Sequence, residues 1–299
     1  MNHNATALDN LALWQDSLLS LQELCQLQCL QMGREAGEQW RRRELSQPFE
    51  LRLPAPDSTE AQHPIPIGVL LRVIGVQQQL AFCRGFLESC PDYLSETDQL
   101  PLGAPPPASP RVVFWDNYFG REALRRFKAV LPLPRPVTAP SFTAVCEELA
   151  GGRADFALLP LGDSREGKML HLYEEIDRFE LHITHTCDIP YPDEGRSISV
   201  ALLSRLYAPT ARANSELLIA CRVPGEEHAL SEILSAASSA GLSLTQIDSL
   251  PDPYDANGVT YHPILRADRD PALFEAYLSI CHPRARIVSK YFHLITKEN

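Results

Sequence analysis

The order of secondary structure in the last third of the sequence limits the fold more than any other feature. From Ser215 onward, apolar runs with strand character alternate with helical patterns in the order strand, helix, strand, strand, helix, strand. The predicted elements are residues 216–223, 229–241, 242–250, 259–267, 271–282 and 285–294. This order is that of a ferredoxin-like sandwich, in which two helices cover one face of a sheet. We therefore expect a C-terminal ferredoxin-like βαββαβ domain over residues 215–297.

The first hundred residues have the pattern of an all-helical domain. Leucines recur at helical spacing within residues 8–43, with Gln, Glu and Asp between them, and a second helical pattern covers residues 67–87. The segment PLGAPPPASP, residues 101–110, is too rich in proline to form a helix or a sheet ladder. The sequence thus predicts a helical domain over residues 1–100, followed by an extended linker.

Strands alternate with helices between the linker and the C-terminal domain. The predicted strands are residues 111–115, 154–161, 181–187 and 197–204, and the predicted helices are residues 119–130 and 141–152. Gly151 and Gly152 end the second helix, because glycine adopts the positive φ angle at which helices commonly stop. This order indicates a mostly parallel sheet with covering helices. We expect one α/β domain over residues 111–210 and an α/β class for the chain.

Composition and charge exclude several classes of partner. The 299 residues carry a formal net charge of −11 at pH 7, which gives no long-range attraction to a phosphate backbone or to anionic lipid. No apolar run approaches the roughly 18 residues of a membrane-spanning helix, and the start of the chain lacks the pattern of a secretion signal. We expect no nucleic acid and no membrane as partner, and a cytoplasmic location.

Cysteine and histidine positions give little support for a metal or a cofactor. The eight cysteines include no CxxC pair, which argues against structural zinc and against the disulfide framework of secreted domains. On a strand, His185 and Cys187 share a face while His182 points away, so at most two of them can bind one metal ion. The nearby acids fit a solvated helical face: Glu174, Glu175 and Asp177. We expect no cofactor and no metal site.

Two motifs of the central domain resemble the prephenate dehydratase family. The stretch FALLPLGDSREGKM, residues 156–169, is an apolar run that opens into a polar turn. In that family a strand ends in Pro-Ile-Glu-Asn-Ser and runs into Glu-Gly at the substrate cleft; the matching residues are Pro160, Leu161, Gly162, Asp163, Ser164, Glu166 and Gly167. The family's Thr-Arg-Phe motif corresponds to the segment GRSIS, with Ser197, Ile198 and Ser199 at its three positions. Upstream, VVFWDNYFGREAL resembles the family's opening strand and loop and keeps Phe119.

The resemblance implies a function in phenylalanine biosynthesis. In the family, prephenate loses carbon dioxide and water to give phenylpyruvate, the Thr hydroxyl assists departure of the substrate hydroxyl, and the Arg binds a carboxylate. This implies Ser197 as the catalytic hydroxyl and a substrate cleft lined by Phe119, Asp163 and Ser164. Arg196, next to the lost arginine, is a further candidate for substrate binding, although the alternation of a strand directs it to the face opposite Ile198.

The spacing of the two motifs differs from the family. The family inserts a whole second lobe between them, whereas only 32 residues, 165–196, separate them here. The resemblance therefore implies a single periplasmic-binding-like α/β lobe.

The C-terminal domain resembles the ACT regulatory domain of the same family. The family's Gly-Ala-Leu motif aligns with His228, Ala229 and Leu230, and its Glu-Ser-Arg-Pro motif aligns with Asp248, Ser249, Leu250 and Pro251. Both motifs are associated with phenylalanine binding, which implies these residues as an effector site for L-phenylalanine and a homodimer formed by paired ACT domains. The N-terminal helices resemble a chorismate mutase domain, with Arg34 where a catalytic lysine falls, or are an unrelated helical appendage.

Other interpretations of the same residues stay open. Ser197 fits a serine that forms hydrogen bonds at the start of a strand, and Asp163 and Ser164 fit residues that satisfy the backbone donors of a following helix. If these residues have only structural roles, the chain is a non-catalytic amino-acid-binding regulator or scaffold that keeps the family's fold. A third interpretation is a subunit that binds a partner protein through its N-terminal helices.

Overall fold

The computed structural model describes residues 3–42, 71–97, 105–165, 167–168, 175–176, 178–192, 195–206, 214–226, 228–252 and 255–295. The chain divides into two compact units. The first contains residues 1–98, 222–263 and 269–286, and the second contains residues 99–221, 264–268 and 287–299. In the described part of the chain, no helix has the length and apolar character needed to cross a membrane.

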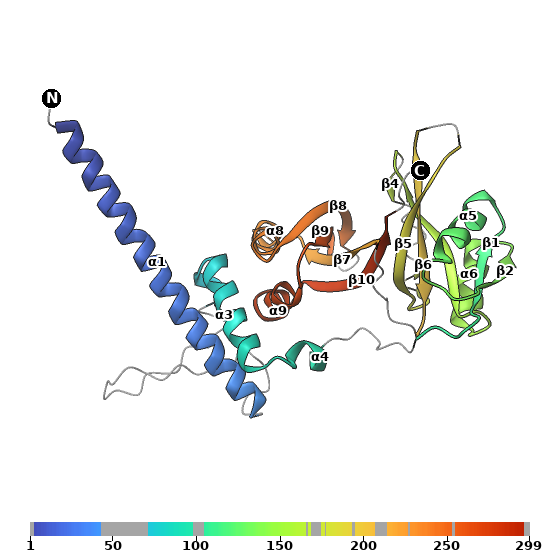
Figure 1. The fold of residues 1–299 in the computed structure, drawn as a ribbon, viewed down its shortest axis with the longest axis horizontal. Coiled ribbons are helices and arrows are strands. Elements are labelled where there is room, and N and C mark those ends of the chain that lie inside the picture. The colour runs from blue at the N-terminus through green and yellow to red at the C-terminus, as the bar shows by residue number, and fades with distance from the viewer. Residues whose placement is uncertain are drawn as a thin grey trace. The chain divides into compact units, whose positions relative to one another are not determined.

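Helices of the first unit come from both ends of the sequence (Figure 1). They are α1 (His3–Arg41), α3 (Val76–Ser89), α4 (Tyr93–Thr97), α8 (Ala229–Ser239) and α9 (Ala272–Cys281). Two helices, α1 and α3, occur where the sequence pattern predicts helical structure, while residues 67–70, at the start of the second predicted helix, lie outside the described residues. Residues 71–73 are helical, and Gly75 has an extended backbone at the N-cap of α3.

Three glycines let α1 and α3 cross at close range. A Cβ atom on Gly33 would overlap the carbonyl oxygen of Phe82, and one on Gly85 would overlap the carbonyl oxygen of Leu30. At Gly37, a Cβ atom would lie 2.6 Å from the carbonyl oxygen of Phe86. Because the obstacle at each position is backbone, a side chain cannot be accommodated by a change of rotamer. The glycines on the two helices therefore set their separation.

Helices α3 and α4 also contact α8 and α9 within this unit. The Tyr93 hydroxyl and the Ser279 hydroxyl lie 2.7 Å apart, and Gln77 donates a hydrogen bond of 2.8 Å to the Ser239 hydroxyl. Tyr93 is buried and packs edge-on against Phe86. Helices α3 and α4 of the N-terminal region consequently pack against the two C-terminal helices.

The C-terminal elements occur in the predicted order. The strands are β7 (Ser215–Pro224), β8 (Leu242–Asp252), β9 (Asp255–Ala267) and β10 (Arg286–Leu294), with α8 between β7 and β8 and α9 between β9 and β10. The hydrogen-bonded order is β10-β7-β9-β8. Strand β9 thus lies between the two strands that α8 connects, which is the split βαβ arrangement expected from the sequence. Strands β7, β9 and β10 have residues in both units.

The second unit begins with alternating strands and helices. They are β1 (Arg111–Trp115), α5 (Tyr118–Phe127), β2 (Arg135–Ala139), α6 (Phe142–Ala150) and β3 (Phe156–Asp163), followed by β4 (Gly167–Lys168), β5 (His182–Pro190) and β6 (Ser197–Ser204). The strand order is β2-β1-β3-β6-β5-β10.

The sheet of the second unit is mixed, so the prediction of a mostly parallel sheet is wrong. Strand β1 is parallel to β2 and β3, and β10 is parallel to β5, whereas β6 is antiparallel to both β3 and β5. The reason lies in the connections. Residues 191–196 join β5 to β6 through a short loop, and a loop of that length permits only an antiparallel pair.

Strand β2 is an element that the sequence pattern does not reveal. It contains Pro136 and follows Pro134, and proline normally argues against a strand. In the structure β2 is the edge of the sheet and pairs only with β1 among the described strands. An edge strand tolerates proline because one side of its backbone needs no ladder hydrogen bond.

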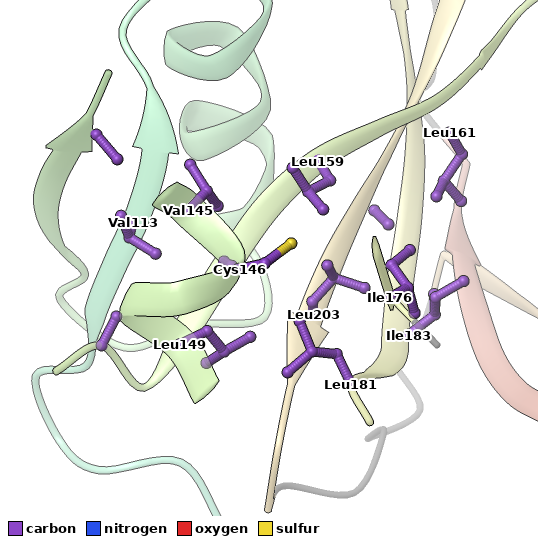
Figure 2. Close-up of a cluster of buried hydrophobic side chains, with 14 of the residues drawn as sticks. Val113, Val145, Cys146, Leu149, Leu159, Leu161, Ile176, Leu181, Ile183 and Leu203 are labelled. Atoms are coloured by element: carbon purple, nitrogen blue, oxygen red, sulfur yellow. The ribbon is translucent and has the colours of Figure 1, made fainter. Parts of the chain in front are cut away.

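Alternate side chains of the strands build two cores on opposite faces of this sheet. Val113, Leu159 and Leu203 face α6, and Figure 2 shows them beside Val145, Cys146 and Leu149 of that helix. The neighbouring residues Val112, Leu158 and Leu202 belong to the other core, which α5 covers with Ala123 and Phe127. The two-residue alternation of the strands therefore produces three layers, with α5 and α6 on opposite sides.

Candidate functional site

The candidate site lies where two parallel strands of the second unit end. Strands β1 and β3 are parallel, so their carboxyl ends point toward the same edge of the sheet, where β3 continues past the level of Trp115 to Asp163. Helix α5 begins at the same edge, where the Asn117 side chain accepts a hydrogen bond of 2.7 Å from the Gly120 amide. In open α/β sheets, ligands bind outside the carboxyl ends of parallel strands. This edge is therefore the favoured position for a ligand.

Ser164 and Ser197 lie next to each other and join β3 to β6. The Ser197 amide donates a hydrogen bond of 3.0 Å to the Ser164 hydroxyl, and the Ser164 amide donates one of 2.9 Å to the Ser197 carbonyl. Ser164 is exposed and Ser197 is half-buried. The two residues that the sequence motifs single out are brought together, and the Ser164 hydroxyl has a structural role there.

Asp163 and Arg196 form an ion pair beside these serines. The distance from Arg196 Nη1 to Asp163 Oδ2 is 3.5 Å, and the exposed fraction of the side chain is 1% for Asp163 and 20% for Arg196. Asp163 also accepts a hydrogen bond of 2.8 Å from the Arg165 amide. Asp163 is expected from the sequence to bond the backbone donors of a following helix. It bonds the Arg165 amide in a turn instead, and the next element is strand β4.

Two aromatic rings complete the surroundings of Arg196. Its guanidinium lies over the ring of Tyr191, 3.9 Å from the ring centroid, a cation–π contact. The Tyr191 ring is 4.7 Å from that of Phe119 at the start of α5. We call these four residues, Phe119, Asp163, Tyr191 and Arg196, the Arg196 cluster.

The Arg196 side chain lies on the same side as Asp163, although simple strand alternation would direct it to the other face. Arg196 precedes the first residue of β6, so the side-to-side alternation of the strand does not apply to it. The Tyr191 amide donates to the Arg196 carbonyl at 2.9 Å, which closes the loop and turns the side chain toward Asp163. Ile198, at the family's arginine position, is buried in the core beside α5. Arg196 therefore places a positive charge at this edge of the sheet, although its backbone position is two residues before that of Ile198.

Sequence reasoning missed the aromatic residues of this edge. Trp115 and Tyr118 are 43% and 45% exposed, although large aromatic side chains are usually more buried. Tyr191 belongs to a loop with no motif. The cluster of aromatics in the segment FWDNYF, next to a strand end, is the signal that points to the first two.

A hollow of about 60 Å³ lies at the opposite end of β3, lined by Leu149, Gly152, Ala154, Asp155, Arg205 and Leu206. Because one water needs about 10–15 Å³ of such space, this hollow holds a few waters, and it is too small for a substrate of the expected size. It surrounds the end of α6, where Arg205 donates a hydrogen bond of 2.8 Å to the Ala150 carbonyl. Arg205 therefore satisfies a carbonyl in the last turn of α6.

The histidines and the cysteine of β5 do not form a metal site. Across the described ranges, no three His, Cys, Asp or Glu side chains are grouped so that they could hold a metal ion. Cys187 is buried in the core beside α5, and burial raises the pKa of its thiol to about 12. A thiol with that pKa stays protonated and is a poor ligand or nucleophile. Glu174 and Asp177 lie outside the described residues.

The expected effector residues lie on two elements of the first unit. His228, Ala229 and Leu230 are at the start of α8, while the others are on β8. His228 has a φ angle of 67°, the left-handed region that favours glycine. Close backbone approach occurs instead at Gly225, where a Cβ atom would overlap the carbonyl oxygen of Val259. The left-handed backbone and the close backbone approach thus occur at two different residues.

The architecture is that of a mixed α/β protein with a large sheet. No known family description matches the sequence, and neither does any curated protein. Among solved structures, prephenate dehydratase from Streptococcus mutans has a TM-score of 0.50 and 15% identity, over 62% of this chain and 99% of that one. At this identity the similarity establishes a common fold alone.

Two further solved structures are similar to a lesser degree. One is described as GqqA, a novel type of quorum quenching acylase (TM-score 0.48, 16% identity, 62% of this chain and 95% of that chain). The other is prephenate dehydratase from Arthrobacter aurescens in complex with L-Phe (TM-score 0.46, 15% identity, 60% and 89%).

Proposed function

We propose that the chain is a divergent prephenate-dehydratase-like protein that binds a small dicarboxylate at the Arg196 cluster and senses an amino acid through an ACT domain. The observation that carries the proposal is the meeting of Ser164, Ser197 and Arg196 at one edge of the sheet. The common fold with a prephenate dehydratase supports it. Arg196 supplies the cation that a carboxylate requires, and the exposed aromatic rings supply a surface for a six-membered ring.

In the catalytic form of this proposal, Ser197 donates a hydrogen bond to the hydroxyl group that leaves prephenate. The bond to the ring carboxylate breaks, its electron pair moves into the ring as carbon dioxide departs, and the C–O bond to the leaving hydroxyl breaks. The hydroxyl takes a proton and leaves as water. Stabilisation of the developing negative charge on that oxygen is the step to which Ser197 contributes.

Removal of the Ser197 hydroxyl tests this role. If the protein converts prephenate to phenylpyruvate, Ser197→Ala should lower kcat by about 100-fold, because a positioned proton donor contributes about that much. The control is Thr138→Ala, which removes an exposed hydroxyl on β2 and should retain turnover. Phenylpyruvate absorbance measures the rate. Equal rates for Ser197→Ala and the unmodified protein would exclude Ser197 as the catalytic hydroxyl.

A second candidate function is a non-catalytic binding protein, and the Asp163–Arg196 pair favours it. The Asp163 carboxylate already pairs with the Arg196 guanidinium that a substrate carboxylate would bind. The negative charge of Asp163 also repels a dicarboxylate. Arg34, at the position of the chorismate mutase lysine, is similarly paired with Glu88 at 2.7 Å. A protein of this kind binds prephenate or an amino acid, measured by calorimetry, and gives no phenylpyruvate above the spontaneous rate.

Amino-acid sensing by the expected effector residues is common to both candidates. We expect L-phenylalanine, at one hundred times its dissociation constant, to raise the thermal midpoint by about 5 °C, since it binds only the folded chain. Ser249→Asp places a carboxylate on an exposed position of the effector site and should abolish the shift, whereas Ser238→Asp, on the exposed face of α8, should retain it. A midpoint unmoved by millimolar phenylalanine would contradict the sensing function.

Pairing of two copies stays a prediction. Strand β8 ends the described strand order, and it exposes Leu244 and Ile247 by 46% and 39%. An edge strand with exposed apolar side chains is suited to pair with a second copy. Sedimentation equilibrium that returns the mass of one chain at micromolar concentration would contradict this pairing.

A further inference from the structure

Two cysteines that are distant in the sequence are neighbours in the first unit. Cys83 lies in the middle of α3 and Cys281 is the last residue of α9, 198 positions later, and their Sγ atoms are 3.9 Å apart. Both are free thiols. The separation is that of two sulfur atoms in contact, and a disulfide bond of about 2.05 Å needs an approach of about 1.9 Å.

The packing around the two thiols holds them in place. Tyr93 and Tyr277 are buried near Cys83, with exposed fractions of 2% and 0%. The hydrogen bond between the Tyr93 and Ser279 hydroxyls joins α4 to α9, two residues before Cys281. Because these contacts fix the helices, the two sulfur atoms stay neighbours, and the remaining approach is within the reach of side-chain rotation.

The two thiols differ in their access to solvent. Cys83 is completely buried, and burial raises the pKa of its thiol well above the ordinary value. Cys281 is partly exposed at the end of its helix. A dissolved oxidant therefore reaches Cys281 first, and Cys83 is positioned as the second thiol.

We propose that Cys83 and Cys281 are a reversible oxidation site, which forms a disulfide between α3 and α9 when a hydroperoxide is present. The Cys281 thiolate attacks the peroxide O–O bond, which breaks to give a sulfenic acid on Cys281 and hydroxide. The Cys83 thiol, which its raised pKa makes a weak nucleophile, relies on its contact with Cys281: its sulfur attacks the Cys281 sulfur, the S–O bond breaks, and the sulfenic hydroxyl leaves with the Cys83 proton as water. In total, two thiols lose two electrons and two protons, and hydrogen peroxide becomes two waters.

The disulfide ties the N-terminal helices to the C-terminal helical layer. It closes a loop of 198 residues, and a cross-link over a long loop restricts the unfolded chain strongly. We expect the oxidised protein to have a thermal midpoint about 5–10 °C above that of the reduced protein.

Peptide mapping of the full-length protein tests the proposal. The protein is treated with hydrogen peroxide at neutral pH, the remaining thiols are alkylated, and a non-reducing digest is analysed by mass spectrometry. We expect a linked peptide pair containing Cys83 and Cys281, two hydrogen masses lighter than the two peptides together. Dithiothreitol should restore both free thiols and the lower midpoint.

Two variants serve as matched comparisons. Cys281→Ser should lose the linked pair and the rise in midpoint, while Cys25→Ser, which removes another partly exposed thiol, should retain both. The proposal is overturned if peroxide links Cys25 to Cys29 instead, if Cys281 goes on to sulfinic acid without a link, or if no thiol is lost. Since the linked pair is detected in the unmodified protein, the test does not depend on the folding of a variant.

Discussion

Gly33→Ala should lower the free energy of unfolding by about 2 kcal/mol, although alanine is the better helix former. Alanine in a helix gains about 1 kcal/mol over glycine. Here its Cβ atom would overlap the Phe82 carbonyl oxygen, and backbone on both sides leaves no rotamer to relieve the overlap. Overpacking of this kind costs about 3 kcal/mol, so the steric effect exceeds the gain in propensity.

Chemical denaturation followed by circular dichroism measures this difference, and the fluorescence of Trp40, whose ring is 5.5 Å from that of Tyr93, reports on the same unit. Gly85→Ala should behave alike, because its Cβ atom would overlap the Leu30 carbonyl oxygen. Ser20→Ala, at an exposed position of α1, is the control and should change the stability by less than about 0.5 kcal/mol. If Gly33→Ala were as stable as Ser20→Ala, close packing of α1 on α3 would be contradicted.

Arg196→Met should destabilise the protein by about 3 kcal/mol. The substitution removes the cationic neighbour of a carboxylate whose exposed fraction is 1%, and loss of one partner of a buried ion pair costs about that much. Asp163→Asn should cost less, because Arg196 is 20% exposed and keeps the Tyr191 ring. The double variant should recover part of the loss, which would show that the two side chains are coupled.

Arg121→Met is the matched control for this pair. Arg121 lies 3.3 Å from Asp116, but these side chains are 67% and 53% exposed, and exposed ion pairs contribute about 0–1 kcal/mol. Urea denaturation at pH 7 compares the four variants. Equal losses for Arg196→Met and Arg121→Met would mean that burial does not strengthen the Asp163–Arg196 pair.

Much of the fold could be predicted because local patterns decide it. Strand β6 occupies residues 197–204, as its apolar pattern predicts, and the βαββαβ order of the C-terminal elements follows from periodicity alone. Helix α6 ends where Gly151 and Gly152 predict, and Gly152 has a φ angle of 70°. In each case the residues that produce the signal are the residues that form the element.

The candidate site could be predicted only in part. The family motifs indicate Ser164 and Ser197, and pairing of β3 with β6 brings them together. Tyr191 and the orientation of Arg196 could not be predicted, because a loop between two strands determines both. The left-handed backbone of His228 also has no local signal, since histidine rarely adopts it without tertiary contacts.

The sequence by itself determined which segments become helices and strands and where several of them stop, since hydrophobic period, helix caps and glycines act over a few residues. Only the tertiary structure decided which strands pair, that β2 is a strand at all, and that Arg196 lies on Tyr191. It also decided that Cys83 meets Cys281. These features depend on contacts between residues far apart in the chain, and their energies arise only when the whole sheet and helical layer have assembled.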